Sequence, residues 1–176
     1  MSAADAVIQA VRAAPGIFQA AALKITPDDF HEETREWCLR NICGCYGRCW
    51  SCPPAVGSVE QWRQKCISYE HAALFSARFT GMYDEAGAAE ARRGFLKVCR
   101  AVRTAAAALT SRSLVLSAGG CVRCGKYAYP QPCRFPGDLF VSLEAAGLVV
   151  GSLAARAGMS RTSDAFYGAV LYDSKP

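Results

Sequence analysis

The chain has 176 residues, of which 52% are hydrophobic and 20% charged, and its formal net charge is +5. This length and composition predict a single domain, residues 1–176, with a core of its own. The longest apolar stretches, 101–109 and 145–155, are far shorter than the roughly 20 residues of a membrane-spanning helix, so no membrane span is predicted. Residues 1–16 lack the order of a secretory signal, and a cytoplasmic location is expected.

Ten cysteines in a chain of this size are many more than an ordinary cytoplasmic domain carries. Disulfides are rare in a reducing compartment, so the cysteines indicate metal or redox chemistry. The positive charge would suit a nucleic-acid partner, but metal-bound cysteines are thiolates, whose negative charge would offset it. We therefore expect no nucleic-acid partner.

The first forty residues predict two helices. Residues 2–14 are alanine-rich and are followed by proline and glycine, which end a helix. Residues 20–25 fit either a strand or a further helical turn. The second helix is expected to be capped by Thr26 or Asp28 and to run to about residue 40, where a cysteine-rich loop begins.

The middle of the chain predicts a loop followed by three regular elements. Glycine and proline are too frequent over residues 43–57 for regular structure. Residues 59–69 predict a helix and residues 72–79 a buried strand. Residues 85–109 predict one long helix, because alanine fills its second half and its apolar residues recur at helical spacing.

The last third predicts a second cysteine loop between further elements. Residues 113–117 form a short apolar strand that ends at a glycine pair, and residues 138–146 and 149–157 predict two helices. Residues 165–172 favour a last strand. Strands separated by long helices predict an α/β sandwich with a small, mostly parallel or mixed sheet, flanking helices and two cysteine-rich loops.

Eight of the ten cysteines gather in two groups on these loops. Glycine-bearing loops allow several thiols to converge, as soft metals require, and the gap of two residues lets one turn present two sulfurs to a metal. They suffice for two four-cysteine sites, or for one site shared by both loops. The candidate metal ligands are Cys38, Cys43, Cys45, Cys49, Cys52, Cys121, Cys124 and Cys133. Cys66 and Cys99 stand alone in apolar helical segments and are expected to pack in the core.

An iron–sulfur cluster is favoured over zinc by the surroundings of the first group. A proline follows Cys52, as in ferredoxin ligand runs, and the glycines permit close contacts with sulfide. Tyr46 and Trp50 could keep water from a cluster. Zinc stays open as the alternative, because pairs of cysteines two residues apart also suit a tetrahedral structural site.

Three ordered motifs span most of the chain. The first is C-x2-Y-G-x2-W-S-C-P-P over residues 43–54, and the second is A-G-G-C-x2-C over residues 118–124. The third is C-R-x-P over residues 133–136, followed by S-x-E-A-x-G over residues 142–147. In these motifs the chain resembles the cysteine-rich, predicted metal-binding proteins of bacteria and archaea, a family of unknown function.

The resemblance implies a ligand set but no activity. It implies that Cys45 and Cys49 are extra thiols, and it places Tyr127 where family members commonly carry a further cysteine. This difference favours one shared cluster, or a second site that borrows Cys45 or Cys49. The ligands implied by the resemblance are Cys38, Cys43, Cys52, Cys121, Cys124 and Cys133.

Two charged residues complete the candidate cofactor site formed with Tyr46 and Trp50. Arg134 follows a ligand and could donate hydrogen bonds to cluster sulfur or to an anionic substrate. Alternatively, Arg134 and Glu144 could form an ion pair that holds the loop on the following helix.

The leading hypothesis is a cytoplasmic protein with one or two iron–sulfur clusters of the four-iron type. It would pass electrons to a partner enzyme or supply it with a cluster. One alternative is a small iron–sulfur enzyme whose open iron position binds substrate. The other is a zinc-stabilised structural or interaction domain. A protein partner is expected, without nucleic acid or membrane.

Overall fold

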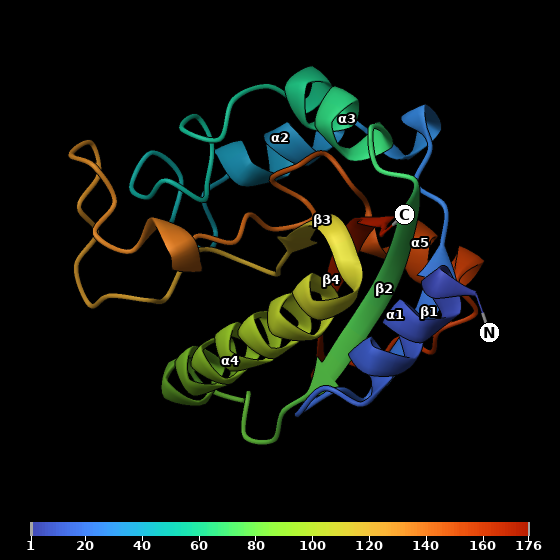
Figure 1. Ribbon diagram of the computed structural model, residues 1–176. Helices are drawn as coiled ribbons and strands as arrows, with labels where there is room; N and C mark the ends of the chain where they lie inside the picture. The colour runs from blue at the N-terminus through green and yellow to red at the C-terminus, as the bar shows by residue number, and fades with distance from the viewer. Residues whose placement is uncertain (1, 176) are drawn as a thin grey trace.

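A four-stranded sheet lies at the centre of the computed structural model, which describes residues 2–175 (Figure 1). Met1 and Pro176, the two ends of the predicted domain, lie outside the described residues. The strand order is β1-β2-β4-β3, and every neighbouring pair is antiparallel. The strands are β1 (Gln19–Leu23), β2 (His71–Arg78), β3 (Thr110–Leu116) and β4 (Ala165–Ser174). The α/β class is therefore confirmed, but the predicted mostly parallel or mixed sheet is wrong.

The position of the last strand explains this correction. Helix α4 (Glu85–Leu109) connects β2 to β3, and these two strands run in the same direction, as a strand–helix–strand unit predicts. They do not touch, because β4 lies between them and pairs antiparallel with both. This is a split β-α-β arrangement. The strand that separates the pair comes last in the chain, so local sequence patterns did not reveal it.

Gly168 lets β4 fit between its neighbours. A Cβ atom at this position would lie 2.5 Å from the ring of Phe75 and 2.6 Å from the carbonyl oxygen of Leu116. Both distances are too short for any side chain. The central strand therefore depends on a glycine at the point where β2 and β3 approach it.

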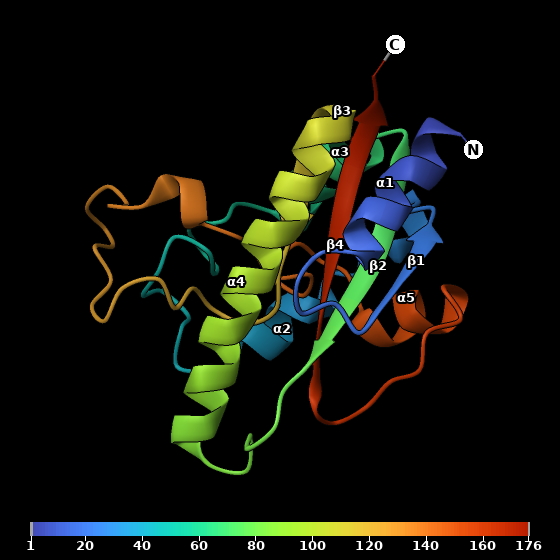
Figure 2. The ribbon, with the colours of Figure 1, turned by 60° about the horizontal axis from the view of Figure 1, so that its bottom comes forward.

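Helices α1 (Ala3–Arg12) and α4 lie together on one face of the sheet (Figure 2). They form one hydrophobic cluster in which Phe95 of α4 packs against Phe75 of β2, with ring centroids 5.9 Å apart. Within residues 2–175 no helix is both long and apolar enough to cross a membrane, α4 included.

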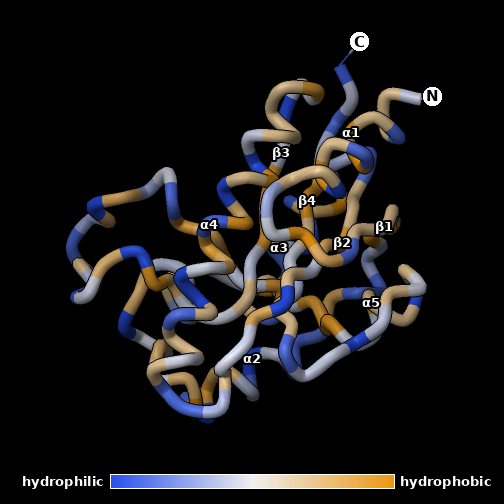
Figure 3. Tube along the Cα trace, turned by 90° about the horizontal axis from the view of Figure 1, so that it is seen from below, coloured by the Kyte–Doolittle hydropathy of each residue, from blue (hydrophilic) through white to orange (hydrophobic). Residues whose placement is uncertain are grey.

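The opposite face is covered by α3 (Val59–Ile67), α5 (Val150–Arg156) and the irregular segment 139–149. Leu143 and Leu148 of that segment are fully buried. Because both faces are covered, the central strands β2 and β4 are mainly apolar rather than alternating (Figure 3).

Two predicted helices differ from those observed. The helix expected from Thr26 to about residue 40 is interrupted: a 3₁₀ turn, η1 (Pro27–Asp29), comes first, and α2 covers only Glu33–Leu39. The helix expected over 138–146 is wrong. There the chain forms a short 3₁₀ turn, η2 (Pro136–Asp138), and then runs beside β3. The amide of Ser117, the residue after β3, donates to the carbonyl of Val141 at 2.7 Å, and its carbonyl accepts from the amide of Leu143 at 2.9 Å, so an isolated bridge replaces helical hydrogen bonds of these two residues.

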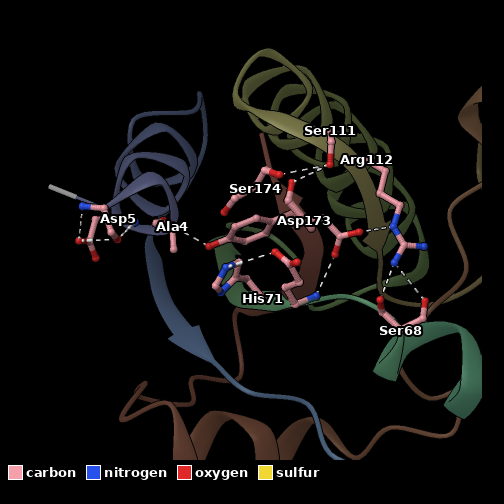
Figure 4. Close-up of polar contacts among 11 residues, drawn as sticks. Ala4, Asp5, Ser68, His71, Ser111, Arg112, Asp173 and Ser174 are labelled. Atoms are coloured by element: carbon pink, nitrogen blue, oxygen red, sulfur yellow. Dashed lines mark hydrogen bonds and ion pairs between the residues drawn. The ribbon is translucent and has the colours of Figure 1, made fainter. Parts of the chain in front are cut away.

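Polar contacts fix the edge strand β3 beyond the ladder (Figure 4). Arg112 of β3 is paired with Asp173 of β4, and its guanidinium also donates to the carbonyl of Ser68 at 2.5 Å. Asp173 in turn accepts from the amide of Glu70 at 2.9 Å. These bonds join the end of the sheet to the turn between α3 and β2.

Candidate metal centre

Two loops lie side by side at one end of the molecule (Figure 1). The first cysteine loop, residues 40–58, connects α2 to α3, and the second cysteine loop, residues 117–138, follows β3. The indole nitrogen of Trp50 donates to the carbonyl of Gln131 at 2.7 Å, and the amide of Cys121 donates to Oγ of Ser51 at 3.0 Å. The fold therefore brings the two predicted cysteine groups together.

Asp138 fixes the end of the second cysteine loop to α4. Its carboxylate accepts from Nε and Nη2 of Arg100 at 2.9 and 2.5 Å and from Nε of Arg123 at 2.8 Å. These bonds, those from Arg100 above all, lower the pKa of Asp138 to about 2. Because Arg123 directly precedes Cys124, the same ion pairs orient the backbone that carries candidate ligands.

Three thiols, those of Cys45, Cys49 and Cys52, lie near enough to one another at the centre of the site to shift one another's pKa. Cys49 and Cys52 are buried. The backbone of Gly120 lies directly against them: a Cβ atom there would be 2.4 Å from Sγ of Cys45 and 3.5 Å from Sγ of Cys52. Only glycine at this position lets the second loop approach the sulfurs so closely.

The neighbouring thiols shift the pKa values of Cys49 and Cys52 in opposite directions. The pKa of Cys49 is lowered because the thiols of Cys45 and Cys52 donate to it, helped by Ser51 and the amide of Cys121. The pKa of Cys52 is raised, because its proton is held by the same contacts with Cys45 and Cys49 and by burial. The site thus stabilises one thiolate before any metal arrives, and thiolates are the form that binds metals.

Three cysteines, Cys52 and two others, line a cavity of about 290 Å³, which we call the Cys38 pocket. Glu144 is the only carboxylate among its lining residues, and burial raises the pKa of that carboxyl. Tyr46 and Trp37 provide aromatic walls. The cysteines that line the Cys38 pocket are Cys38, Cys43 and Cys52.

A second, much smaller space of about 20 Å³ is lined by other residues of the two loops, and we call it the Cys133 pocket. Trp50 lines it and packs edge-to-face on Tyr129, with ring centroids 5.0 Å apart. Arg123 lies 3.9 Å above the ring of Phe135 at the same pocket. The cysteines that line the Cys133 pocket are Cys49, Cys121, Cys124 and Cys133.

Seven of the eight candidate ligands therefore line one of two neighbouring pockets, and Cys45 lines neither. Within the described part of the chain, no three histidine, cysteine, aspartate or glutamate side chains converge as they would around one metal ion. The ligand set stays a prediction, and what the structure adds is the division of the thiols between the pockets.

The surroundings of Arg35 indicate whether the residues near Cys38 suit a thiolate-bound group. Its Nε and Nη2 atoms are buried and have no hydrogen-bond partner. Desolvation lowers the pKa of this guanidinium, and the nearest groups that favour its charge are Cys38, Glu32 and Tyr46. A buried cation without a partner is costly, and a thiolate at Cys38 would relieve it. The surroundings of Cys38 therefore fit a negatively charged metal–thiolate group.

The structure separates the predicted cofactor-contacting residues. Tyr46 and Glu144 line the Cys38 pocket, whereas Trp50 and Arg134 line the Cys133 pocket. The Arg134 to Glu144 ion pair considered from the sequence is absent among the described residues, because the two side chains face different pockets. Arg134 instead donates to the carbonyl of Lys126.

Sequence reasoning missed two residues of the site. Ser51 is completely buried, lies 3.4 Å from Sγ of Cys49 and accepts the amide of Cys121. Its position between two candidate ligands was the available signal. Arg35 stands one helical turn before Cys38, a spacing that places both on one side of α2. Cys66 and Cys99 are buried in the two hydrophobic clusters, as predicted.

The sequence comparisons agree with this kind of site. The chain belongs to the family described as predicted metal-binding protein (DUF2284), whose pattern matches residues 23–167. That range includes both cysteine loops, and it confirms the resemblance inferred from the three motifs. No curated protein and no solved structure shows a significant match to the chain.

Proposed function

We propose that the protein binds iron–sulfur clusters through its two cysteine loops and passes electrons, or a cluster, to a protein partner. The observation that carries this proposal is the gathering of seven thiols, from segments about 70 residues apart, around two adjoining pockets. Cysteine thiolates are the usual ligands of such clusters.

The shape of the Cys38 pocket favours a cluster over zinc. With Zn–S bonds of about 2.3 Å, a tetrahedral zinc site needs its sulfurs at one point, about 3.8 Å from one another. A cluster instead spreads its thiolates around a body of several atoms. Three thiols around a cavity of about 290 Å³ suit the second arrangement.

The distribution of charge supports a negatively charged cofactor. The two cysteine loops, residues 40–58 and 117–138, contain five arginines or lysines and one acidic residue, Asp138. The whole chain has 20 basic and 15 acidic residues, so the remainder has 15 basic and 14 acidic residues and the loops carry +4 of the excess of +5. An oxidised four-iron cluster with four thiolates carries a charge of about −2, which this excess would offset.

Exposed apolar residues beside the Cys38 pocket support a protein partner. Trp37 and Ile42, which line the pocket, are 43% and 89% exposed, and Leu39 between them is 59% exposed. Large apolar side chains grouped in this way favour protein contact. A partner seated here would lie next to the cofactor, as electron or cluster transfer requires.

The test is the content of iron, zinc and acid-labile sulfide per chain after oxygen-free purification, together with the EPR spectrum after reduction. We expect iron and sulfide in equal amounts, broad absorption near 400 nm and a cluster signal on reduction. A colourless protein with stoichiometric zinc and no sulfide would contradict the proposal and support the zinc-stabilised domain.

A further inference from the structure

We propose that the eight cysteines of the loops form two unlike metal sites rather than one shared site. The closed site consists of four thiolates in the Cys133 pocket. The mixed site consists of three thiolates and the carboxylate of Glu144 in the Cys38 pocket. This inference rests on the proposed function, since it assigns the ligands of the clusters proposed there.

The turn Cys49-Trp50-Ser51-Cys52 divides the two sites. Its first thiol lines the Cys133 pocket and its last thiol lines the Cys38 pocket. The buried hydroxyl of Ser51 lies between them, 3.4 Å from Sγ of Cys49 and 3.9 Å from Sγ of Cys52. Two cysteines separated by two residues usually serve one metal, and here they line different pockets.

The Cys133 pocket has the composition of a closed site. The thiols of Cys49, Cys121, Cys124 and Cys133 line it, and no aspartate or glutamate does. The ring of Trp50 covers the pocket, as a low-dielectric shell around a metal would. Family members commonly carry a cysteine at the position of Tyr127. In this chain we assign Cys49 as the fourth ligand in its place.

The Cys38 pocket has only three thiols. Cys38, Cys43 and Cys52 line it together with Glu144, and no cysteine of the second cysteine loop does. Ser142, which lines the same pocket, accepts the amide of Ala145 at 3.0 Å and so orients the backbone directly after Glu144. A carboxylate is a weaker ligand for a soft metal than a thiolate is. The mixed site should therefore hold its metal less tightly than the closed site does.

Cys45 belongs to neither site. It lines neither pocket, its Sγ lies 3.8 Å from the hydroxyl of Tyr127, and a Cβ atom at Gly120 would lie 2.4 Å from the same sulfur. We assign it to the wall between the two sites.

The experiment maps which cysteines a metal protects. The oxygen-free protein is treated with iodoacetamide, and the labelled cysteines are identified by mass spectrometry before and after removal of metal with a chelator. In Cys133→Ser we expect about half the metal of the wild type, with Cys49, Cys121 and Cys124 labelled and Cys38 and Cys52 still protected. In Cys38→Ser we expect the reverse pattern.

The controls keep the proposal falsifiable. Cys66→Ala changes a core residue outside both pockets and should retain all metal. If Cys133→Ser does not fold, Cys124→Ser is the substitute variant for the Cys133 pocket. Glu144→Gln should lose metal only from the Cys38 pocket, and full retention would overturn the role of Glu144. Loss of all protection in either single cysteine variant would overturn the two-site division. Zinc in place of iron would contradict the proposed function. The same labelling experiment would still show whether the cysteines form two sites or one.

Discussion

The amide of Cys121 donates to the hydroxyl of Ser51 at 3.0 Å, although 70 residues separate the two in the sequence. Ser51 is completely buried and also touches the sulfur of Cys49. One small hydroxyl therefore joins the two cysteine loops and lies against a candidate ligand of each pocket. Its removal should affect both the docking of the loops and the thiols.

Ser51→Ala should lower the free energy of unfolding by about 1 to 3 kcal/mol, because it leaves the Cys121 amide without its acceptor. The change is measured by urea unfolding of the metal-free protein, followed by circular dichroism. Ser152→Ala is the matched control, since Ser152 is exposed on α5 and should change stability by less than about 0.5 kcal/mol. Equal effects of the two substitutions would contradict the role of Ser51.

Gly120→Ala should damage the centre of the site through steric overlap. The new methyl group would lie 2.4 Å from Sγ and 3.0 Å from Cβ of Cys45, and overpacking of this kind costs about 1 to 3 kcal/mol. We expect a lower melting temperature and a lower metal content. Gly125→Ala in the same loop is the control, because nothing lies within 4 Å of its added Cβ atom. A fully loaded Gly120→Ala protein would rule out the close approach.

Asp138→Asn should reveal a pH-dependent contribution to stability. The ion pairs with Arg100 and Arg123 lower the pKa of the Asp138 carboxyl from 3.8 to about 2 in the folded state. A lowered folded-state pKa stabilises the protein above the unfolded-state pKa, and this stabilisation is lost as the pH falls toward 2. The difference in unfolding free energy between wild type and variant should be constant at neutral pH and shrink between about pH 4 and pH 2.

Urea unfolding at stepped pH measures this difference. Asp28→Asn is the control, because the exposed side chain of Asp28 makes no hydrogen bond or ion pair among the described residues. A difference between wild type and Asp138→Asn that stays constant down to pH 2 would refute the ion-pair account.

Cys66 and Cys99 should behave as core residues and not as ligands. Both are buried, and desolvation raises the pKa of each thiol to about 12. At pH 8 they should therefore react with iodoacetamide far more slowly than the exposed Cys43 in metal-free protein. The double variant Cys66→Ala/Cys99→Ala should keep the metal content of the wild type. Loss of metal from this variant would contradict the assignment of Cys66 and Cys99 to the core.

Local sequence signals predicted most elements but not their arrangement. The helix over residues 85–109 is observed with the predicted bounds, because alanine content and apolar spacing both favour it. Residues 138–146 also have helical composition, yet the carbonyl of Val141 and the amide of Leu143 bond to Ser117 instead. The sheet type was missed because β4, the last strand, lies between β2 and β3.

The same limit applies to the candidate site. Cysteine spacing identified both loops, since closely spaced thiols on glycine-rich segments are a local signal. It did not show that Cys49 and Cys52 face different pockets, because their directions depend on how the second loop packs against Gly120 and Ser51. Arg35 was missed because only burial distinguishes it from other surface arginines.

The division of the thiols has a consequence for chain topology. Three of the four cysteines of the Cys133 pocket lie within 13 residues of one another, and Cys49 comes from the other loop. A metal bound by all four would close a ring of roughly 70 residues through that one sulfur, as a covalent cross-link does. The ring would enclose α3, β2, α4 and β3, so metal occupancy would restrict two of the four strands in the unfolded ensemble.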